Sequence, residues 1–186
     1  ANAWTLASTP QGQNDLFPEG NLNAQRDYGY NRAQLNWYTI DPLFFRNDNR
    51  TPDNIKNSAS QSNNYSREIL ETEVFPNKDP EPGLINNLPT LDLAFRPNLR
   101  GPYNYETSGG NYSAGLNPDG TLASPSSRWG GIMRDIQSSD FEASNVEFIQ
   151  FWIMDPFNDE DGNPNHSGGE LYFNIGSISE DVLKDS

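Results

Sequence analysis

The sequence predicts an all-β protein, a β-sandwich that forms a single domain over residues 1–186, with long loops and at most short helices. Three observations predict this fold. The apolar residues fall into about six short runs, several of which alternate with polar residues as strands do. The segments between the runs are rich in turn formers, with 24 Asn, 15 Gly and 14 Pro. Almost no stretch places its apolar residues at helical spacing.

The first two strands are predicted near the N-terminus. Ala3–Ala7 is a short run of β type that ends before Pro10. Residues 32–40 alternate, and the two faces of that run consist of Ala33, Leu35 and Trp37 on one side and Arg32, Gln34 and Asn36 on the other. Alternation with period two indicates a half-buried strand, which Asp41-Pro42 then ends.

The middle of the chain predicts loops and one clear strand. Residues 46–66 contain a single large aliphatic residue, Ile55, among mostly polar ones, which indicates a long loop. Residues 66–74 fit either a helical turn or an edge strand. A proline-rich loop over residues 77–89 follows, and Thr90–Phe95 then alternates as a short strand.

Turn signals precede the strands of the last third. Asn117-Pro118-Asp119-Gly120 predicts a turn, because proline suits its second position and glycine tolerates a positive φ. Trp129–Arg134 predicts a strand. Its glycines, Gly130 and Gly131, suggest a backbone turn that a bulkier residue would strain.

The two most apolar β runs lie near the C-terminus. Val146–Met154 is apolar at nearly every position, which predicts a central strand covered on both faces. Residues 171–175 alternate and predict a further strand. Ser179-Glu180-Asp181 predicts a helix start, with a hydroxyl at the N-cap and acids in the first turn.

Charge and composition exclude several classes of function. The net charge is −14, from 26 acidic and 12 basic residues. Nucleic acids and anionic membrane surfaces bind clustered Lys and Arg, so we expect neither as a partner. The absence of Cys excludes disulfides, zinc–thiolate sites and cysteine nucleophiles. No apolar run is long enough for a membrane helix. Both ends of the sequence look cut, so we expect an excerpt of a much longer chain.

Candidate catalytic and metal-binding residues are few. His166 is the single histidine and lies in an Asn/Pro/Gly loop, which argues against a Ser-His-Asp triad or a zinc site. Carboxylate pairs are abundant in so acidic a chain, and glycoside hydrolysis stays open as a weak alternative. Asp159, Asp161 and Asn163 alternate like the start of a calcium loop, although the terminal Glu and flanking helices do not follow. We therefore predict no catalytic residue, cofactor or metal site, with calcium at these three residues as an alternative.

The aromatic residues support two interpretations. Trp37, Trp129 and Trp152 fall in predicted strands, so we expect them in the core. For the tyrosines beside Gly and Asn, among them Tyr28 and Tyr103, the sequence leaves open whether they are buried or exposed, and exposed rings would be able to stack on sugars. A carbohydrate-binding module is therefore the second hypothesis for the function.

Six stretches resemble one family. They are YGYNRAQLNWYTIDPL (28–43), LDLAF (91–95), RGPYNY (100–105), RWGGIMR (128–134), DFEASN (140–145) and GSISEDVL (176–183). Together they resemble the SprA/Sov family, the very large outer-membrane translocon proteins of the type IX secretion system in Bacteroidetes. The stretch from Arg128 onward is the most specific part of the resemblance.

The resemblance implies a non-catalytic part of a machine for protein secretion and gliding motility. Proteins of this family form a very large barrel through which folded cargo crosses the outer membrane, and they carry soluble β insertions. The chain would then lie at the outer membrane or cell surface and contact other parts of the parent translocon, its partner proteins or its cargo. The segment 141–178 also resembles a jelly roll of the galactose-binding type. The family supplies no catalytic residues to carry over.

Overall fold

The computed structural model describes residues 3–79, 83, 86–136, 138, 140–155, 168–176 and 182. The described chain is β-rich with few helices. It divides into two compact units, which are described separately below. The first consists of Ala1–Trp37, Leu93–Ile136 and Tyr172–Ser186, and the second of Tyr38–Asp92 and Gln137–Leu171. The prediction of a single domain stays a prediction.

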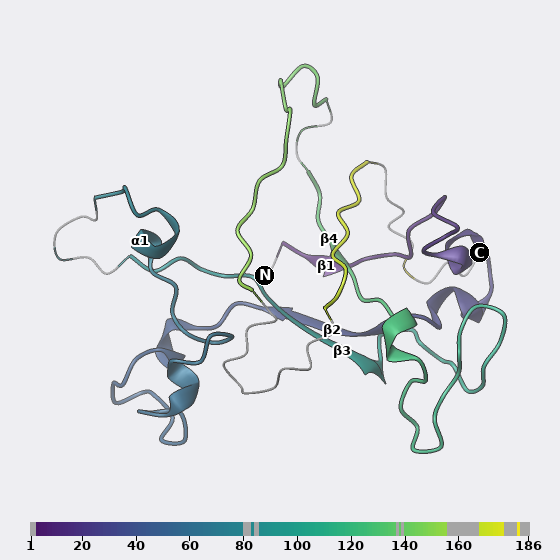
Figure 1. The fold of residues 1–186 in the computed structure, drawn as a ribbon, viewed down its shortest axis with the longest axis horizontal. Coiled ribbons are helices and arrows are strands. Elements are labelled where there is room, and N and C mark those ends of the chain that lie inside the picture. The colour runs from purple at the N-terminus through teal and green to yellow at the C-terminus, as the bar shows by residue number, and fades with distance from the viewer. Residues whose placement is uncertain are drawn as a thin grey trace. The chain divides into compact units, whose positions relative to one another are not determined.

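The assigned strands form two small sheets (Figure 1). β1 (Thr5–Leu6) pairs antiparallel with β4 (Ile132–Met133), with Thr5 opposite Met133 and Leu6 opposite Ile132. β2 (Ala33–Tyr38) pairs with β3 (Asp92–Arg100). Strands are therefore confirmed in all four places where the first 134 residues predict them.

Residues 129–133 connect the two sheets of the first unit. Trp129 forms a parallel bridge with Arg32, since its N–H donates to the Asn31 carbonyl at 3.1 Å and its carbonyl accepts from the Ala33 N–H at 2.7 Å. Two residues later, the Gly131 carbonyl accepts from the Ala7 N–H at 3.0 Å. The segment thus lies between β1 and β2 and hydrogen-bonds to both sides.

Gly130 is required by close packing and not by a turn. A Cβ at Gly130 would lie 2.8 Å from the Leu35 Cβ and 3.1 Å from the Phe95 ring. Its φ is not in the left-handed region. The sequence therefore identified the right position for a glycine but the wrong reason for it.

The other assigned elements are short helices. α1 (Glu71–Val74) resolves the ambiguous stretch 66–74 in favour of a helical turn, and the Glu73 carboxylate accepts from the Leu70 N–H at 3.0 Å at its start. The short 3₁₀ helices are η1 (Pro18–Asn21), η2 (Arg26–Gly29), η3 (Pro42–Phe44), η4 (Ala59–Gln61) and η5 (Pro125–Ser127).

Two local predictions for loops are confirmed. Residues 46–66 contain only turns, bends and η4, as their polar composition indicates. The turn at Asn117–Gly120 closes with the Gly120 N–H on the Asn117 carbonyl at 2.9 Å, and Gly120 has a φ of +85°. Leu116 and Leu122 form an antiparallel bridge across that turn.

The prediction of a central strand at Val146–Met154 is wrong. Residues 146–155 have no assigned strand, and their side chains are exposed from Val146 to Ile153. Residues 171–175 likewise have no assigned strand and carry exposed side chains. The apolar pattern indicates how much free energy a segment would gain if its side chains were buried. A strand forms, however, only where a neighbouring backbone supplies the hydrogen bonds of the sheet. The predicted helix start at Ser179-Glu180-Asp181 lies outside the described residues.

The core of the first unit is small and unusually polar. Its buried hydrophobic residues are Phe17, Tyr28, Ala33, Leu35 and Leu122. Its buried polar and charged residues are Ser8, Thr9, Glu19, Asn31, Arg32, Asn104, Glu106 and Arg128. Buried charges are costly unless they are paired, so their contacts decide how this unit holds together.

Candidate functional site

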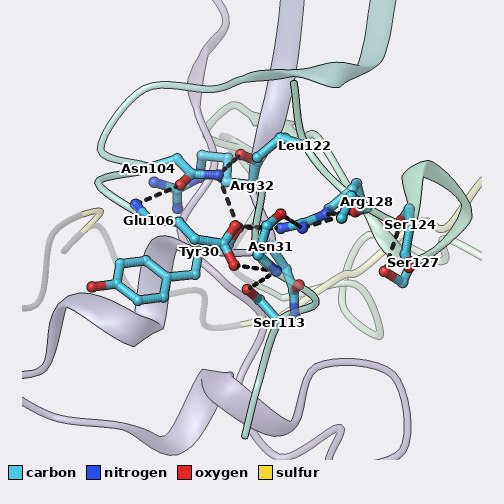
Figure 2. A network of polar contacts seen from close by, with 12 residues as sticks. Tyr30, Asn31, Arg32, Asn104, Glu106, Ser113, Leu122, Ser124, Ser127 and Arg128 are labelled. Carbon is cyan, nitrogen blue, oxygen red and sulfur yellow. Dashed lines mark hydrogen bonds and ion pairs between the residues drawn. The ribbon is translucent and has the colours of Figure 1, made fainter. Parts of the chain in front are cut away.

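A buried ion pair lies at the centre of the first unit. The Arg128 Nη1 lies 2.8 Å from the Glu106 Oε2, and both side chains are 0% exposed. The same network joins residues from several distant stretches of the chain (Figure 2). Such a pair is stable only when further hydrogen bonds satisfy both partners.

The Arg128 guanidinium satisfies three backbone carbonyls besides the carboxylate. Nη1 donates to the Tyr30 carbonyl at 2.7 Å, and Nη2 donates to the Gly115 carbonyl at 2.9 Å. Nε and Nη2 both donate to the Ala123 carbonyl, at 2.9 and 2.8 Å. The Glu106 Oε1 accepts from the Gly115 N–H at 2.8 Å. The pair therefore acts as a cross-link between loops that have few apolar residues of their own.

Asn104 extends this network to the strands. Its side-chain amide donates to the carbonyls of Tyr30 and Arg32, at 2.8 and 2.9 Å. Its Oδ1 accepts from the Glu106 N–H at 3.0 Å. The loop that carries Asn104 and Glu106 is thus fixed by its inward-facing polar side chains.

A second buried arginine, Arg32, packs on Trp129. The guanidinium carbon lies 5.1 Å from the centre of the Trp129 ring. Its Nη2 donates to the Ala7 carbonyl at 3.2 Å and its Nη1 to the Pro102 carbonyl at 3.4 Å. Burial lowers the pKa of Arg32, and the nearby Tyr28, Tyr103 and Glu19 oppose that shift only in part.

Glu19 completes the buried charges. Its Oε1 accepts from the Asn31 side-chain amide at 3.1 Å and from the Trp129 indole N–H at 3.2 Å. Its Oε2 and the Arg32 Nε have no hydrogen-bond partner among the described residues. A buried polar atom without a hydrogen-bond partner costs free energy. The side chains of Glu19 and Arg32 are therefore less fully hydrogen-bonded than the Glu106–Arg128 pair.

This arrangement suits a structural role. Glu19 and Glu106 are both 0% exposed, so solvent and substrate do not reach their carboxylates in this structure. A general acid or base must lie within hydrogen-bond reach of the reacting group. The Glu106 carboxylate holds the backbone of Gly115 and the Arg128 side chain, and the Glu19 carboxylate holds the side chains of Asn31 and Trp129.

Sequence reasoning missed these charged residues. The alternation over residues 32–40 places Arg32 on the polar face of a strand, whereas the structure buries it completely. Glu106 and Arg128 carry no local signal of burial, because each is buried by a partner 22 positions away in the chain. Only the position of Arg128 beside the predicted strand at 129–134 gave a hint.

The predicted candidates for metal binding and acid–base chemistry are not among the residues that the structure describes. Asp159, Asp161, Asn163 and His166 fall outside the described residues. Within the described ranges, no group of three or more His, Cys, Asp or Glu could hold a metal ion. The calcium alternative therefore stays a prediction.

The aromatic residues divide differently from the prediction. Trp129 is half-buried and packs edge-to-face on Phe17, with ring centroids 5.5 Å apart, and Trp37 is also half-buried. The core assignment of Trp152 is wrong, because its side chain is 66% exposed. The structure decides the open question for Tyr28, which is buried and whose hydroxyl accepts from the Thr9 N–H at 3.0 Å.

A run of exposed apolar side chains lies in the second unit. Residues 146–153 include six apolar side chains that are all exposed, namely Val146, Phe148, Ile149, Phe151, Trp152 and Ile153. Phe148 is 74% exposed and Ile153 is 63% exposed. Monomeric soluble proteins rarely expose contiguous apolar patches of this kind, and such patches mark interaction sites. We call residues 146–153 the apolar segment.

None of the helices in the described part of the chain has the length and hydrophobicity that a membrane crossing requires. A comparison with protein-family models gives no match for this chain, and neither does a comparison with curated proteins.

Proposed function

We propose that this chain is a non-catalytic structural and interaction module of an outer-membrane protein-secretion translocon, of the type IX kind that also serves gliding motility. The observation that carries the interaction role is the exposure of the apolar segment. Nonpolar side chains gain roughly 25 cal/mol for each Å² removed from water, so a partner that covers them gains binding energy. The translocon context comes from the resemblance in sequence.

The finer fold that we propose is a β-sandwich of the jelly-roll, galactose-binding type. β1 to β4 would then be parts of its sheets. The period-two alternation of residues 32–40 and 90–95, where β2 and β3 lie, supports this, because half-buried strands of a sandwich show that pattern.

We place the module at the outer membrane or cell surface, in contact with other parts of its parent translocon or with partner or cargo proteins. A non-catalytic role is supported by the way the buried carboxylates are used. The Glu106 carboxylate accepts hydrogen bonds from Arg128 and Gly115, and Glu19 accepts from Asn31 and Trp129. These contacts serve the packing of the chain.

The experiment is made in a bacterium that carries the parent gene. Ile149→Asp combined with Ile153→Asp is introduced into that gene, and Phe44→Asp is the control at another exposed apolar position. We expect the double variant to reduce secreted cargo at an unchanged level of translocon protein, and the control to secrete normally. Normal secretion and normal gliding in the double variant would refute the proposed role.

A carbohydrate-binding module is the second candidate, and one observation favours it. Tyr103 and Tyr105 are 43% and 55% exposed, while Asn104 and Glu106 between and beside them are buried. Tyr103 has a φ of +62°, an uncommon conformation for a bulky residue. The buried hydrogen bonds thus hold two exposed rings on a fixed loop, as stacking on a sugar would require.

Titration of the chain with a glycan panel tests this candidate. Binding that is lost in Tyr105→Ala and kept in Tyr38→Ala, a control of similar exposure, would support carbohydrate recognition. If no glycan binds at millimolar concentration, the candidate is wrong.

A further inference from the structure

In an extended conformation, the apolar segment would present hydrophobic side chains on both of its faces. Val146, Phe148 and Trp152 occupy alternate positions, and Ile149, Phe151 and Ile153 occupy the positions between them. Figure 1 draws residues 146–155, in light green, as a long run without a strand arrow. Successive side chains of an extended chain point to opposite sides. A partner that adds backbone beside this segment would therefore bury apolar side chains on both faces.

The contact between Trp152 and Phe75 gives the segment one anchor within its own unit. The two rings meet edge-to-face, with centroids 6.1 Å apart and planes at 82°. Phe75 is the residue that follows α1. Trp152 nevertheless stays 66% exposed, so this contact leaves most of the ring available to a partner.

The charged residues that flank the apolar segment in sequence are all acidic. Residues 140–155 contain four carboxylates, Asp140, Glu142, Glu147 and Asp155, and no Lys or Arg. Over residues 135–186 there are twelve Asp and Glu against a single Lys, so this stretch holds −11 of the net charge of −14. The acidic residues are thus concentrated in the part of the sequence that contains the apolar segment.

Three of the five Lys and Arg residues of the second unit are engaged with other acids. Within the described residues of this unit, the ion pairs join Arg50 to Asp48 at 3.3 Å, Arg67 to Glu73 at 2.9 Å, and Lys78 to Glu71. The described ion pairs do not include Glu142 or Glu147, which are both exposed. Their charge is therefore directed to solvent or to a partner.

We propose that the apolar segment binds, by strand addition, an extended segment of a partner protein that carries Lys or Arg beside its apolar residues. This inference rests on the proposed interaction role and names the chemistry of the partner. Strand addition supplies affinity through main-chain hydrogen bonds and specificity through alternate side chains. Complementary charge accelerates association and selects against partners of the wrong sign.

The charge argues against the other occupants of this segment. A second copy would bring Glu142 and Glu147 near the same acidic residues, and like charges opposite each other destabilise a strand pair. An anionic membrane surface attracts Lys and Arg and would repel this stretch. A basic, partly apolar polypeptide satisfies both the exposed side chains and the carboxylates.

The test uses the whole chain and two peptides as probes. Both peptides alternate valine and threonine, and one is flanked by lysines and the other by glutamates. We expect the lysine peptide to bind at least about tenfold more tightly, with an affinity that falls as salt is raised. Glu147→Lys should remove that preference, and Asp53→Lys, the same charge change at another exposed site of this unit, should keep it.

Three outcomes would overturn the inference. Equal binding of both peptides that is lost in Ile149→Asp would refute a basic partner but leave the interaction role intact. Concentration-dependent self-association that the lysine peptide does not reverse would make a second copy the occupant. Absence of binding by either peptide, with the chain monomeric in sedimentation, would refute strand addition, whereas the proposed function fails only if cargo secretion is unaffected.

Discussion

Replacement of Arg128 by Met tests whether the buried ion pair holds the first unit together. The substitution removes the partner of Glu106 and the donors to the carbonyls of Tyr30, Gly115 and Ala123. Both charged side chains are 0% exposed, so the Glu106 carboxylate would stay buried without its counter-ion. Breaking a buried pair by removing one partner costs about 3–5 kcal/mol.

That cost is a large share of the stability of a typical domain, about 5–15 kcal/mol. We expect Arg128→Met to lower the midpoint of urea unfolding strongly, as followed by tryptophan fluorescence and far-ultraviolet circular dichroism. The control is Arg50→Met, because the Arg50–Asp48 pair is exposed and such pairs contribute at most about 1 kcal/mol.

A double-mutant cycle separates the charge from the packing. Glu106→Gln keeps the shape of the side chain and removes its charge. Combined with Arg128→Met, it removes the uncompensated carboxylate, so we expect the double variant to lose clearly less than the sum of the single losses. A loss below about 1 kcal/mol for Arg128→Met, or strictly additive losses in the cycle, would refute the reasoning.

Three further predictions follow from the packing and the hydrogen bonds. Gly130→Ala should destabilise the chain by about 1–3 kcal/mol in urea unfolding, because the new Cβ would crowd neighbouring side chains. Gly110→Ala is the control and should be nearly neutral, because a Cβ at Gly110 meets no atom within 4 Å. Equal effects of the two substitutions would contradict this prediction. Trp152→Ala should cost less than about 1.5 kcal/mol in the same assay, since the ring is mostly exposed, and a loss of the size expected for a buried Trp would show that it is covered. The hydrogen bond from the Arg67 side chain lowers the pKa of Glu73 below its ordinary value of 4.5. The ionised Glu73 therefore makes a small contribution to stability at a pH above 4.5, and this contribution is lost as the pH falls through the lowered pKa. Titration by nuclear magnetic resonance should show this pKa rising towards the ordinary value in Arg67→Met, and an unchanged pKa would contradict the assignment.

Local patterns predicted the local structure of this chain. The turn at Asn117–Gly120 forms because proline and glycine favour its backbone angles regardless of the surroundings. β2 and β3 lie where period-two alternation indicates them, although β3 runs on to Arg100, beyond the predicted end at Phe95. These features depend on residues close together in sequence, which is why sequence alone identifies them.

The buried charges depended on the tertiary structure. Arg32 lies on the nominally polar face of a strand, but Trp129, Ala7 and Pro102 surround its guanidinium from distant parts of the chain. Whether an arginine stays in solvent or becomes buried is decided by the carbonyls and carboxylates that the fold brings to it. Those partners have no signature within the strand itself.

The sequence by itself determined that residues 146–154 are apolar on both faces and lie in the most acidic part of the chain. The tertiary structure decided that these side chains stay exposed from Val146 to Ile153. Hydrophobicity is a property of each residue, whereas burial requires a second surface at the right distance with a backbone to complete the ladder. Composition therefore determines how much free energy the burial of these side chains would contribute. The arrangement of the folded chain determines whether they are buried.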